Sequence, residues 1–235
     1  MPRKTGILES TQVRRFERGT YLTYKIVGPK HSTFKLTFII AHLHYVNSSR
    51  LLSRHTQIMA PLEAFTSSSS VKGLSSVTTL VVGATSALVF DPPFLVPDGE
   101  AVVAWIKKTT KLPVKAVFVT HHHPDHFFAA NAVLEAYPEA KFYAAPYVRD
   151  GIDREYEEKV VFWPSVFGKE NIYATPRKPE PFPHSLIRLE GNPESPIFLL
   201  GPLQGDSVDH TLFWLPQEKI LIAGDAVYAR STHVW

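Results

Sequence analysis

The stretch Thr-His-His-His-Pro-Asp-His, residues 120–126, says more about the fold and chemistry of this chain than any other. Taken from His121, it fits His-x-His-x-Asp-His (HxHxDH), with His121, His123, Asp125 and His126 as candidate metal ligands. Imidazoles and a carboxylate gathered in one short loop form the nitrogen-rich, partly anionic donor set that zinc and similar divalent metals prefer. The competing interpretation is a histidine-rich loop that binds no metal.

The segment before this cluster indicates where it lies in the fold. Residues 114–120 read Val-Lys-Ala-Val-Phe-Val-Thr, a β-branched and aromatic run that predicts a buried strand. The histidines therefore stand where a strand ends and a loop begins, which is a usual place for an active site in folds that combine strands and helices. The sequence predicts a metal site at the end of this strand.

Composition excludes several kinds of site. The chain has 235 residues, of which 44% are apolar, enough for one sizeable domain with a real core. Residues 1–60 carry ten Lys/Arg against two acids, which leaves fifteen against twenty in the remainder. The mildly acidic remainder argues against a nucleic-acid groove. Cysteine is absent from the sequence, so thiolate zinc sites, disulfides and cysteine nucleophiles are excluded.

The front of the chain differs from the rest. We predict that residues 1–72 form a basic, Ser/Thr-rich, poorly ordered extension, ending in the linker-like run at 66–70, and that residues 73–235 form the domain. A presequence for an organelle and a small strand-bearing lead-in are the alternatives. His42, His44 and His55 fall in this extension and are treated as incidental. No stretch reaches the roughly eighteen continuous apolar residues of a membrane span, and we expect a cytoplasmic protein unless the presequence alternative holds.

From residue 75 onward strands and helices follow each other regularly. Two apolar runs predict a hairpin that ends at Asp91, and Pro97-Asp98-Gly99 opens a helix with Asp98 as candidate cap. The further predicted strands are 114–120, 141–144, 185–189, 197–200, 211–215 and 219–223, the helices are 127–136 and 147–161, and 162–184 is a proline-rich loop. This order predicts an α+β fold in which helices pack outside two β-sheets.

Two further acids stand at predicted strand ends. Gly205-Asp206 follows the strand at 197–200, and Gly224-Asp225 follows the strand at 219–223. In each pair the glycine lets the backbone turn tightly and places a carboxylate at the sheet edge. An isolated Gly-Asp pair is more often a turn than a ligand, but two such pairs downstream of the histidine cluster make Asp206 and Asp225 candidate ligands.

With these residues in place, the chain resembles the metallo-β-lactamase superfamily over roughly residues 75–235. The resemblance rests on the strand ending in Asp91, the motif at 121–126, and the segment from Gly205 through Leu215-Pro216 to Asp225. It implies a four-layer αβ/βα sandwich with a hydrolase site for one or two metals. It also implies that His121 and His123 belong to a first metal site, Asp125 and His126 to a second, and that Asp225 bridges both. Asp91 resembles the acid that orients ligand histidines from behind.

The chain departs from the family pattern at two points. The family usually has a histidine where Asp206 stands, and His210 is the rival third ligand or else a partly buried histidine opening a strand. A carboxylate in this position admits manganese or iron besides zinc. Relatives usually continue past the bridging acid to another metal-binding histidine, whereas this sequence stops ten residues after Asp225. We therefore expect a domain that lacks its usual C-terminal segment, and His233 is given no role.

The favoured function is hydrolysis of a small carbonyl substrate (lactone, ester, thioester or lactam) by metal-activated water. The favoured metal is Zn²⁺, as one or two ions, and Mn²⁺ and Fe²⁺ are the alternatives. Asp125 would pass on a proton, and Tyr228, placed as in the homoserine-lactone lactonases, would bind the developing oxyanion or else fill the core. Phe127 and Phe128 narrow the pocket or, as we prefer, pack the next helix. We expect no nucleic-acid or membrane partner.

Two other functions stay open. The first is an iron-dependent oxidoreductase on the same fold, since the Asp206 carboxylate suits iron. The second is a non-catalytic metal-binding fragment, since the segment after Asp225 is short. The sequence does not choose among the carbonyl substrates, because one metal set serves them all.

Overall fold

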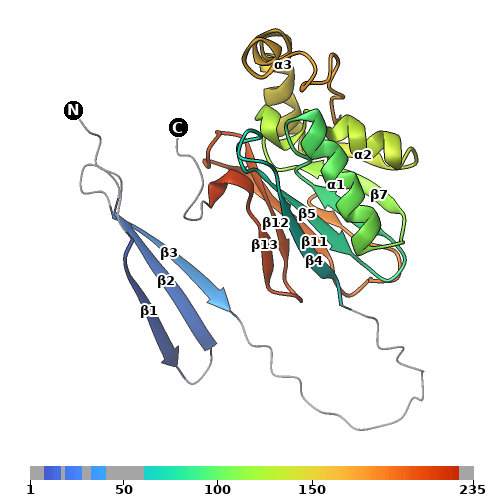
Figure 1. The fold of residues 1–235 in the computed structure, drawn as a ribbon. Helices are drawn as coiled ribbons and strands as arrows, with labels where there is room; N and C mark the ends of the chain where they lie inside the picture. The colour runs from blue at the N-terminus through green and yellow to red at the C-terminus, as the bar shows by residue number, and fades with distance from the viewer. Residues whose placement is uncertain (1–7, 17–18, 28–32, 41–60, 228–235) are drawn as a thin grey trace, which may run out of the picture. The chain divides into compact units, whose positions relative to one another are not determined.

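The computed structural model describes the strands at residues 8–16, 19–27 and 33–40 and all of residues 61–227 (Figure 1). The chain divides into two compact units, Met1–Thr56 and Gln57–Trp235. Across the described ranges, none of the helices has both the length and the apolar character needed to span a bilayer.

The first unit contains a three-stranded antiparallel sheet in the order β1-β2-β3. Its strands are β1 (Leu8–Phe16), β2 (Gly19–Val27) and β3 (Thr33–Ile40). These strands fall within residues 1–72, the predicted basic extension. That this extension is poorly ordered remains a prediction. His42, His44 and His55 lie outside the described residues.

The start of the second unit differs from the predicted boundary at residue 72. β4 (Glu63–Ser68) pairs with β5 (Val77–Val82) in antiparallel register, with Phe65 opposite Leu80. The serine-rich stretch that looked like a linker is therefore partly an edge strand. Composition misled here because an edge strand satisfies its backbone hydrogen bonds on one side and needs few apolar side chains.

The larger sheet of this unit is mixed and has six strands in the order β4-β5-β6-β7-β8-β9. Its other strands are β6 (Ala87–Phe90), β7 (Val114–Val119), β8 (Lys141–Ala144) and β9 (Glu180–Pro181). β4 to β6 run antiparallel, which confirms the predicted hairpin, and β6 to β9 run parallel. The parallel connections carry α1 (Val96–Thr109), η1 (Pro124–His126) with α2 (Ala130–Ala136), and α3 (Pro146–Phe167).

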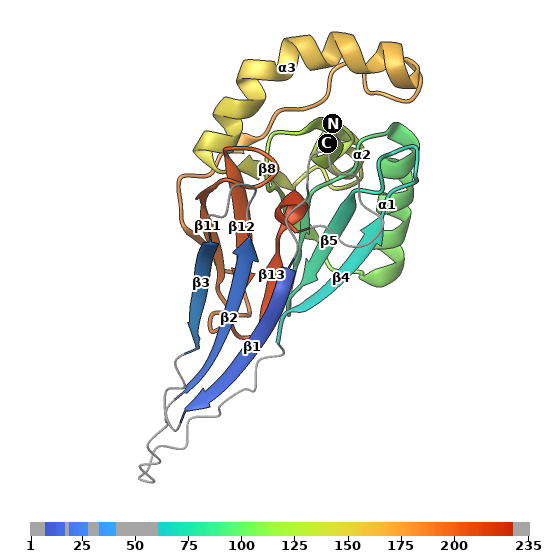
Figure 2. The same cartoon turned by 90° about the vertical axis from the view of Figure 1, so that its left-hand side faces the viewer.

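The second sheet is antiparallel, in the order β10-β11-β12-β13. It consists of β10 (Leu186–Ile187), β11 (Ile197–Leu203), β12 (His210–Leu215) and β13 (Ile220–Ile222), followed by η2 (Gly224–Ala226). The four strands predicted here are confirmed, with shifted ends. Figure 2 shows β11, β12 and β13 standing beside β4 and β5, with α1 on the outer side of the latter.

Two apolar cores hold these layers together. One lies between the helices and the mixed sheet, around Ile106, Val117 and Val133. The other lies between the two sheets, where Phe90 packs on Phe118 and Phe213 with ring centroids 5.6 and 4.8 Å apart. Mixed and antiparallel sheets flanked by helices confirm the predicted α+β class.

Three local predictions need correction. Asp98 does not cap α1, because its carboxylate instead accepts hydrogen bonds from the backbone N and the hydroxyl of Ser70, each 3.0 Å long. α3 runs six residues beyond its predicted end at 161, through Pro164. Its extra turns are stabilised by Trp163 and Phe167, whose rings pack 5.3 and 5.1 Å from that of Phe94.

The third correction concerns the segment after the histidine motif. Residues 127–129 precede α2, which begins only at Ala130. Phe127 and Phe128 are both fully buried in the core beneath the helices. These two rings therefore pack in the core, as the preferred prediction had it, and they do not line the cavity described below.

Candidate metal centre

The site begins with the hydrogen bonds around Thr120, directly after β7. Its backbone N and its hydroxyl donate to the two oxygens of Asp91, at 2.7 and 2.8 Å. Thr120 Oγ1 also lies 3.0 Å from His121 Nδ1. Since the single hydroxyl hydrogen is given to Asp91, Oγ1 must accept the hydrogen on Nδ1. This arrangement leaves the lone pair of His121 on Nε2.

The first donor cluster joins the ends of two distant segments. His121 Nε2, a nitrogen of His123 and a carboxylate oxygen of Asp206 all lie within 4.8 Å of one another. Asp206 Oδ2 is 2.6 Å from His123 Nδ1 and 3.7 Å from His121 Nε2. His121 Nε2 and Asp206 Oδ2 are both buried, and neither has a hydrogen-bond partner.

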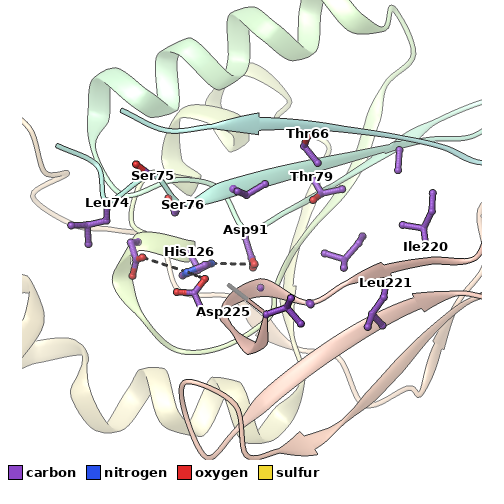
Figure 3. Close-up of a pocket in the computed structure, with 17 residues that line it drawn as sticks. Thr66, Leu74, Ser75, Ser76, Thr79, Asp91, His126, Ile220, Leu221 and Asp225 are labelled. Atoms are coloured by element: carbon purple, nitrogen blue, oxygen red, sulfur yellow. Dashed lines mark ion pairs between the residues drawn. The ribbon is translucent and has the colours of Figure 1, made fainter. Parts of the chain in front are cut away.

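The second donor cluster surrounds His126, whose side chain is 1% exposed. Its Nε2 lies 3.2 Å from Asp225 Oδ1 and 3.4 Å from Asp125 Oδ2, and its Nδ1 lies 3.1 Å from Asp91 Oδ2 (Figure 3). Neither ring nitrogen has the geometry of a hydrogen bond. His121, His126 and Asp225 again form a group within 4.8 Å, so the two clusters share His121.

The buried atoms that lack a hydrogen bond show whether a cation fits this site. A buried polar atom without a hydrogen bond costs about 1–3 kcal/mol, and here such atoms of His121, His126 and Asp206 come together from the loop after β7 and the β11–β12 loop. A divalent ion among the nitrogens and carboxylates satisfies them together, in the manner typical of zinc sites. The donor set therefore fits a metal, and does so with the residues that the sequence singled out.

The electrostatics of the cluster differ from one histidine to the next. Burial, aided by the neighbouring His126 and His123, holds the pKa of His121 well below its ordinary value of 6.5. Burial also lowers the pKa of His123, although Asp206 opposes the shift. His121 is accordingly neutral at physiological pH, with its Nε2 lone pair available to a metal.

His126 and Asp125 shift in the directions expected of an ion pair. Burial works to lower the pKa of His126, but the carboxylates of Asp125 and Asp91 outweigh it and the pKa is raised well above 6.5. Burial works to raise the pKa of Asp125, but the charge of His126, 3.4 Å away, outweighs it and the pKa is lowered. The second cluster is thus rich in negative charge, as a cation site requires.

His210, the rival third ligand, is placed differently from Asp206. It is fully buried, and its Nε2 lies 2.8 Å from the carbonyl oxygen of Ala223, which can only accept, so Nε2 carries the hydrogen. Its ring stacks on that of His121 with centroids 4.6 Å apart and planes 16° from parallel. It belongs to neither donor cluster. The geometry therefore favours Asp206 as the ligand and gives His210 a packing contact.

Three other histidine and tyrosine residues discussed from the sequence differ in whether the structure describes them. Tyr228 and His233 lie outside the described residues. His122, which entered the motif only as an unspecified position, is buried and contacts Asp209 and Glu155. Neither of these acids follows a strand and a glycine, so no pattern in the sequence singled them out.

A cavity of about 340 Å³ opens beside the second cluster (Figure 3). Asp91, Asp125, His126 and Asp225 stand at one end. The rest of the lining comes from β4, from β5 and the turn before it, and from β13 and the residues after it, with aliphatic walls and four hydroxyl-bearing residues. The aliphatic walls are Ala64, Leu74, Val77, Ile220, Leu221, Ile222, Ala223 and Val227, and the hydroxyls come from Thr66, Ser75, Ser76 and Thr79. No Lys or Arg of the described chain lines it.

Comparison with known proteins gives a family match over most of the chain. Residues 71–235 match the family model described as the metallo-beta-lactamase superfamily. The hydroxyacylglutathione hydrolase of Francisella tularensis subsp. novicida (strain U112) is 27% identical over 118 residues, which are 50% of this chain and 36% of that protein. The hydroxyacylglutathione hydrolase of Francisella tularensis subsp. holarctica (strain FTNF002-00 / FTA) is 26% identical over the same length. The chain thus spans about a third of these curated relatives.

Solved structures share the fold at low identity. The B3 metallo-beta-lactamase BLEG-1 superposes with a TM-score of 0.53 at 17% identity, covering 72% of this chain and 74% of that one. A beta-lactamase domain protein from Burkholderia ambifaria gives a TM-score of 0.53 at 16% identity, covering 73% and 54%. At these identities the likeness concerns the fold alone.

Proposed function

Because the chain belongs to the metallo-beta-lactamase superfamily, we propose that it is a metal-dependent hydrolase of a small, uncharged carbonyl compound, with thioesters and esters as the first classes to test. The observation that carries this proposal is that His121 Nε2, Asp206 Oδ2 and His126 Nε2 are buried without a hydrogen bond and lie in two donor clusters that share His121. Atoms of this kind are destabilising unless a cation binds between them.

In this proposal the two clusters divide the metal ligands between them. His121, His123 and Asp206 would hold one ion, and Asp125, His126 and Asp225 would hold a second. A bound divalent ion supplies a water of lowered pKa and polarises the carbonyl under attack. The mixed nitrogen and oxygen donors suit Zn²⁺ first, and the carboxylate of Asp206 also admits Mn²⁺ or Fe²⁺.

The protein's own groups would then handle the proton and the substrate. The lowered pKa of Asp125 keeps its carboxylate ionised, so that an oxygen can accept the proton of the attacking water and pass it to the leaving group. Asp91 and Thr120 would keep His121 in the tautomer that offers Nε2. Tyr228, just beyond the described residues, is proposed to bind the leaving oxygen or the oxyanion.

The cavity supports the choice of substrate. Its aliphatic walls suit an apolar acyl group, and about ten water-sized volumes of roughly 30 Å³ fit within it. Apart from the metal ions proposed here, the described lining offers an anionic substrate no Lys or Arg. Thioesters come first because the curated relatives are named hydroxyacylglutathione hydrolases. We further propose that the partner is a small molecule, and neither nucleic acid nor membrane.

The test is hydrolysis by the purified chain after loading with Zn²⁺, Mn²⁺ or Fe²⁺. We expect metal-dependent turnover of neutral thioesters or esters that is abolished in His121→Ala/His123→Ala. Asp153→Asn, which alters only an exposed ion-pair group on α3, should retain the parental rate. Metal-loaded protein that hydrolyses no thioester, ester, lactone or lactam would refute the proposal.

A second candidate is an iron-dependent oxidoreductase, favoured by the carboxylate oxygen of Asp206 2.6 Å from His123 Nδ1. Purification without oxygen followed by metal analysis separates the two functions. Stoichiometric iron with oxygen uptake supports the oxidoreductase, and stoichiometric zinc supports the hydrolase. A non-catalytic metal-binding fragment would instead show one weak site or none in calorimetric titration.

A further inference from the structure

His122 stands in the sequence between two candidate ligands, but its nitrogens contact two acids, Asp209 and Glu155, that belong to neither donor cluster. Its Nδ1 lies 2.7 and 2.8 Å from the two oxygens of Asp209. Both side chains are nearly buried, His122 with 7% and Asp209 with 8% of the side chain exposed. Because a carboxylate can only accept, His122 Nδ1 must carry the hydrogen that joins them.

This pair connects the two loops that build the first donor cluster. His122 is the neighbour in sequence of both His121 and His123, while Asp209 follows Asp206 by three residues. Two described hydrogen bonds of the segment 204–209, from Gly205 N to Ser207 O and from Gln204 Nε2 to Gly205 O, stay inside it, and outside it Asp206 contacts His123. The Asp209–His122 contact therefore ties this segment to the loop after β7.

α3 closes over the pair from the outside. Glu155 Oε1 lies 3.3 Å from His122 Nε2, and Glu155 Oε2 lies 2.7 Å from Lys159 Nζ. Gly151 on the same helix lies directly against the pair. A Cβ built there would collide with Asp209 Oδ2 and would lie 3.0 Å from His122 Nδ1. The helix thus approaches closely enough to exclude water from the contact.

Breaking such a contact leaves a poorly compensated charge in a water-excluded place. Burial works to raise the pKa of Asp209, but the hydrogen bond from His122 opposes it and the pKa is lowered, so the carboxylate stays ionised. An ionised, buried carboxylate needs its donor. The segment that carries Asp206 is consequently held in one position.

We propose that His122 and Asp209 are positioning residues for the first donor cluster: they hold the Asp206 segment against the His121–His123 loop and thereby set the affinity of that cluster for a divalent cation. This inference rests on the metal site of the proposed function. Partners behind the ligands commonly change metal affinity by 10–100-fold when they are replaced. The contact acts through Asp206, since neither His122 nor Asp209 belongs to a donor cluster.

The first experiment measures Zn²⁺ affinity by competition with a chromophoric chelator for the parent chain, His122→Ala and Asp209→Asn. We expect both variants to bind the first ion about 10–100-fold more weakly. Asp209→Asn has nearly the same size as the parent side chain, which keeps a folded variant in hand if His122→Ala does not fold. Asp153→Asn is the matched control, because it removes charge from an ion-paired acid on α3 without touching this contact.

Two further measurements separate positioning from general stability. Hydrogen exchange of residues 204–209 in the metal-free protein should quicken in both variants and stay unchanged in the control. With Co²⁺ in place of Zn²⁺, the visible spectrum of Asp209→Asn should change in the same direction as that of Asp206→Asn, since both weaken the same ligand.

The outcomes are distinguishable. Parental Zn²⁺ affinity in folded Asp209→Asn, or a Co²⁺ spectrum equal to that of the parent, overturns this inference and leaves the proposed hydrolase standing. A parent chain that binds no divalent ion overturns both. Weaker affinity without faster exchange at 204–209 also overturns it, because the segment would then not depend on the pair.

Discussion

The carboxylate of Asp91 accepts two hydrogen bonds from Thr120, one from the backbone N at 2.7 Å and one from the hydroxyl at 2.8 Å. Asp91 itself adopts a left-handed conformation with φ of 52°, and its carbonyl accepts a hydrogen bond from Thr78 Oγ1 at 2.7 Å. One acid at the end of β6 thereby fixes the residue that directly precedes the histidine cluster. Backbone strain of this kind is tolerated where the surroundings determine the conformation.

Replacement of Asp91 by Asn should weaken metal binding about 10–100-fold. The amide offers one acceptor oxygen where the carboxylate serves Thr120 N, Thr120 Oγ1 and His126 Nδ1. Chelator competition with Zn²⁺ measures the change. Thr120→Ser keeps the hydroxyl and should bind like the parent, and an unchanged affinity in Asp91→Asn would show that this acid does not orient the ligands.

Two single variants can show whether Asp206 or His210 is the third ligand of the first ion. Asp206→Ala should lose the first ion, because it removes the oxygen 2.6 Å from His123 Nδ1. His210→Ala should keep the ion but unfold at lower temperature, because it removes the stack on His121 and the bond to Ala223 and leaves a cavity. Metal content by elemental analysis and thermal unfolding are the measurements. Loss of metal in His210→Ala with retention in Asp206→Ala would reverse the assignment.

The metal-free protein should be most stable near pH 6.5. The pKa of His121 is lowered in the folded state, so below 6.5 the unfolded chain binds more protons and stability falls as pH falls. The pKa of His126 is raised, so its stabilisation is complete below 6.5 and is lost as pH rises through the folded value. Each group contributes a slope of at most about 1.4 kcal/mol per pH unit.

Denaturant titrations across pH 5–8 in the presence of a chelator test this expectation. His121→Asn should flatten the acidic side of the profile, and His126→Asn should flatten the alkaline side. Equal effects of both variants on the same side would contradict the opposite signs of the two shifts.

Gly151→Ala should destabilise the protein even though alanine favours helices. The helical preference for alanine over glycine amounts to about 1 kcal/mol, whereas overpacking costs about 1–3 kcal/mol. The added methyl collides with Asp209, whose carboxylate is held by His122 and cannot move freely. Urea unfolding measures the difference, with Glu157→Ala on the exposed side of α3 as control. A gain in stability would mean that the Asp209 side chain yields.

Much of the fold was predictable from local patterns. The hairpin before Asp91 and the strand before Thr120 were confirmed, because short β-branched runs bounded by turn residues have few alternatives. The end of α3 and the role of Asp98 were not predictable. Both depend on contacts from distant segments, with Phe94 and Ser70 respectively.

The candidate site, too, was predictable from the sequence in part. The spacing within residues 121–126 sufficed to nominate a metal loop, and the Gly-Asp pairs nominated Asp206 and Asp225. The sequence does not separate Asp206 from His210, since both residues lie on the same short segment. In the structure both lie beside His121, but Asp206 presents a carboxylate oxygen to the cluster, whereas His210 Nε2 is bonded to the Ala223 carbonyl.

The sequence by itself determined the donor chemistry, because imidazoles and carboxylates at strand ends are a property of residue type and local order. Only the tertiary structure decided how these groups share their hydrogens: Thr120 orients His121, the Ala223 carbonyl occupies His210, and Asp209 occupies His122. The physical reason is that a buried nitrogen takes its role from the partner it meets. The partners of His210 and His122 lie on other strands and loops, and Thr120, the neighbour of His121, is itself held by Asp91 at the end of another strand, so all these contacts form only when the chain packs.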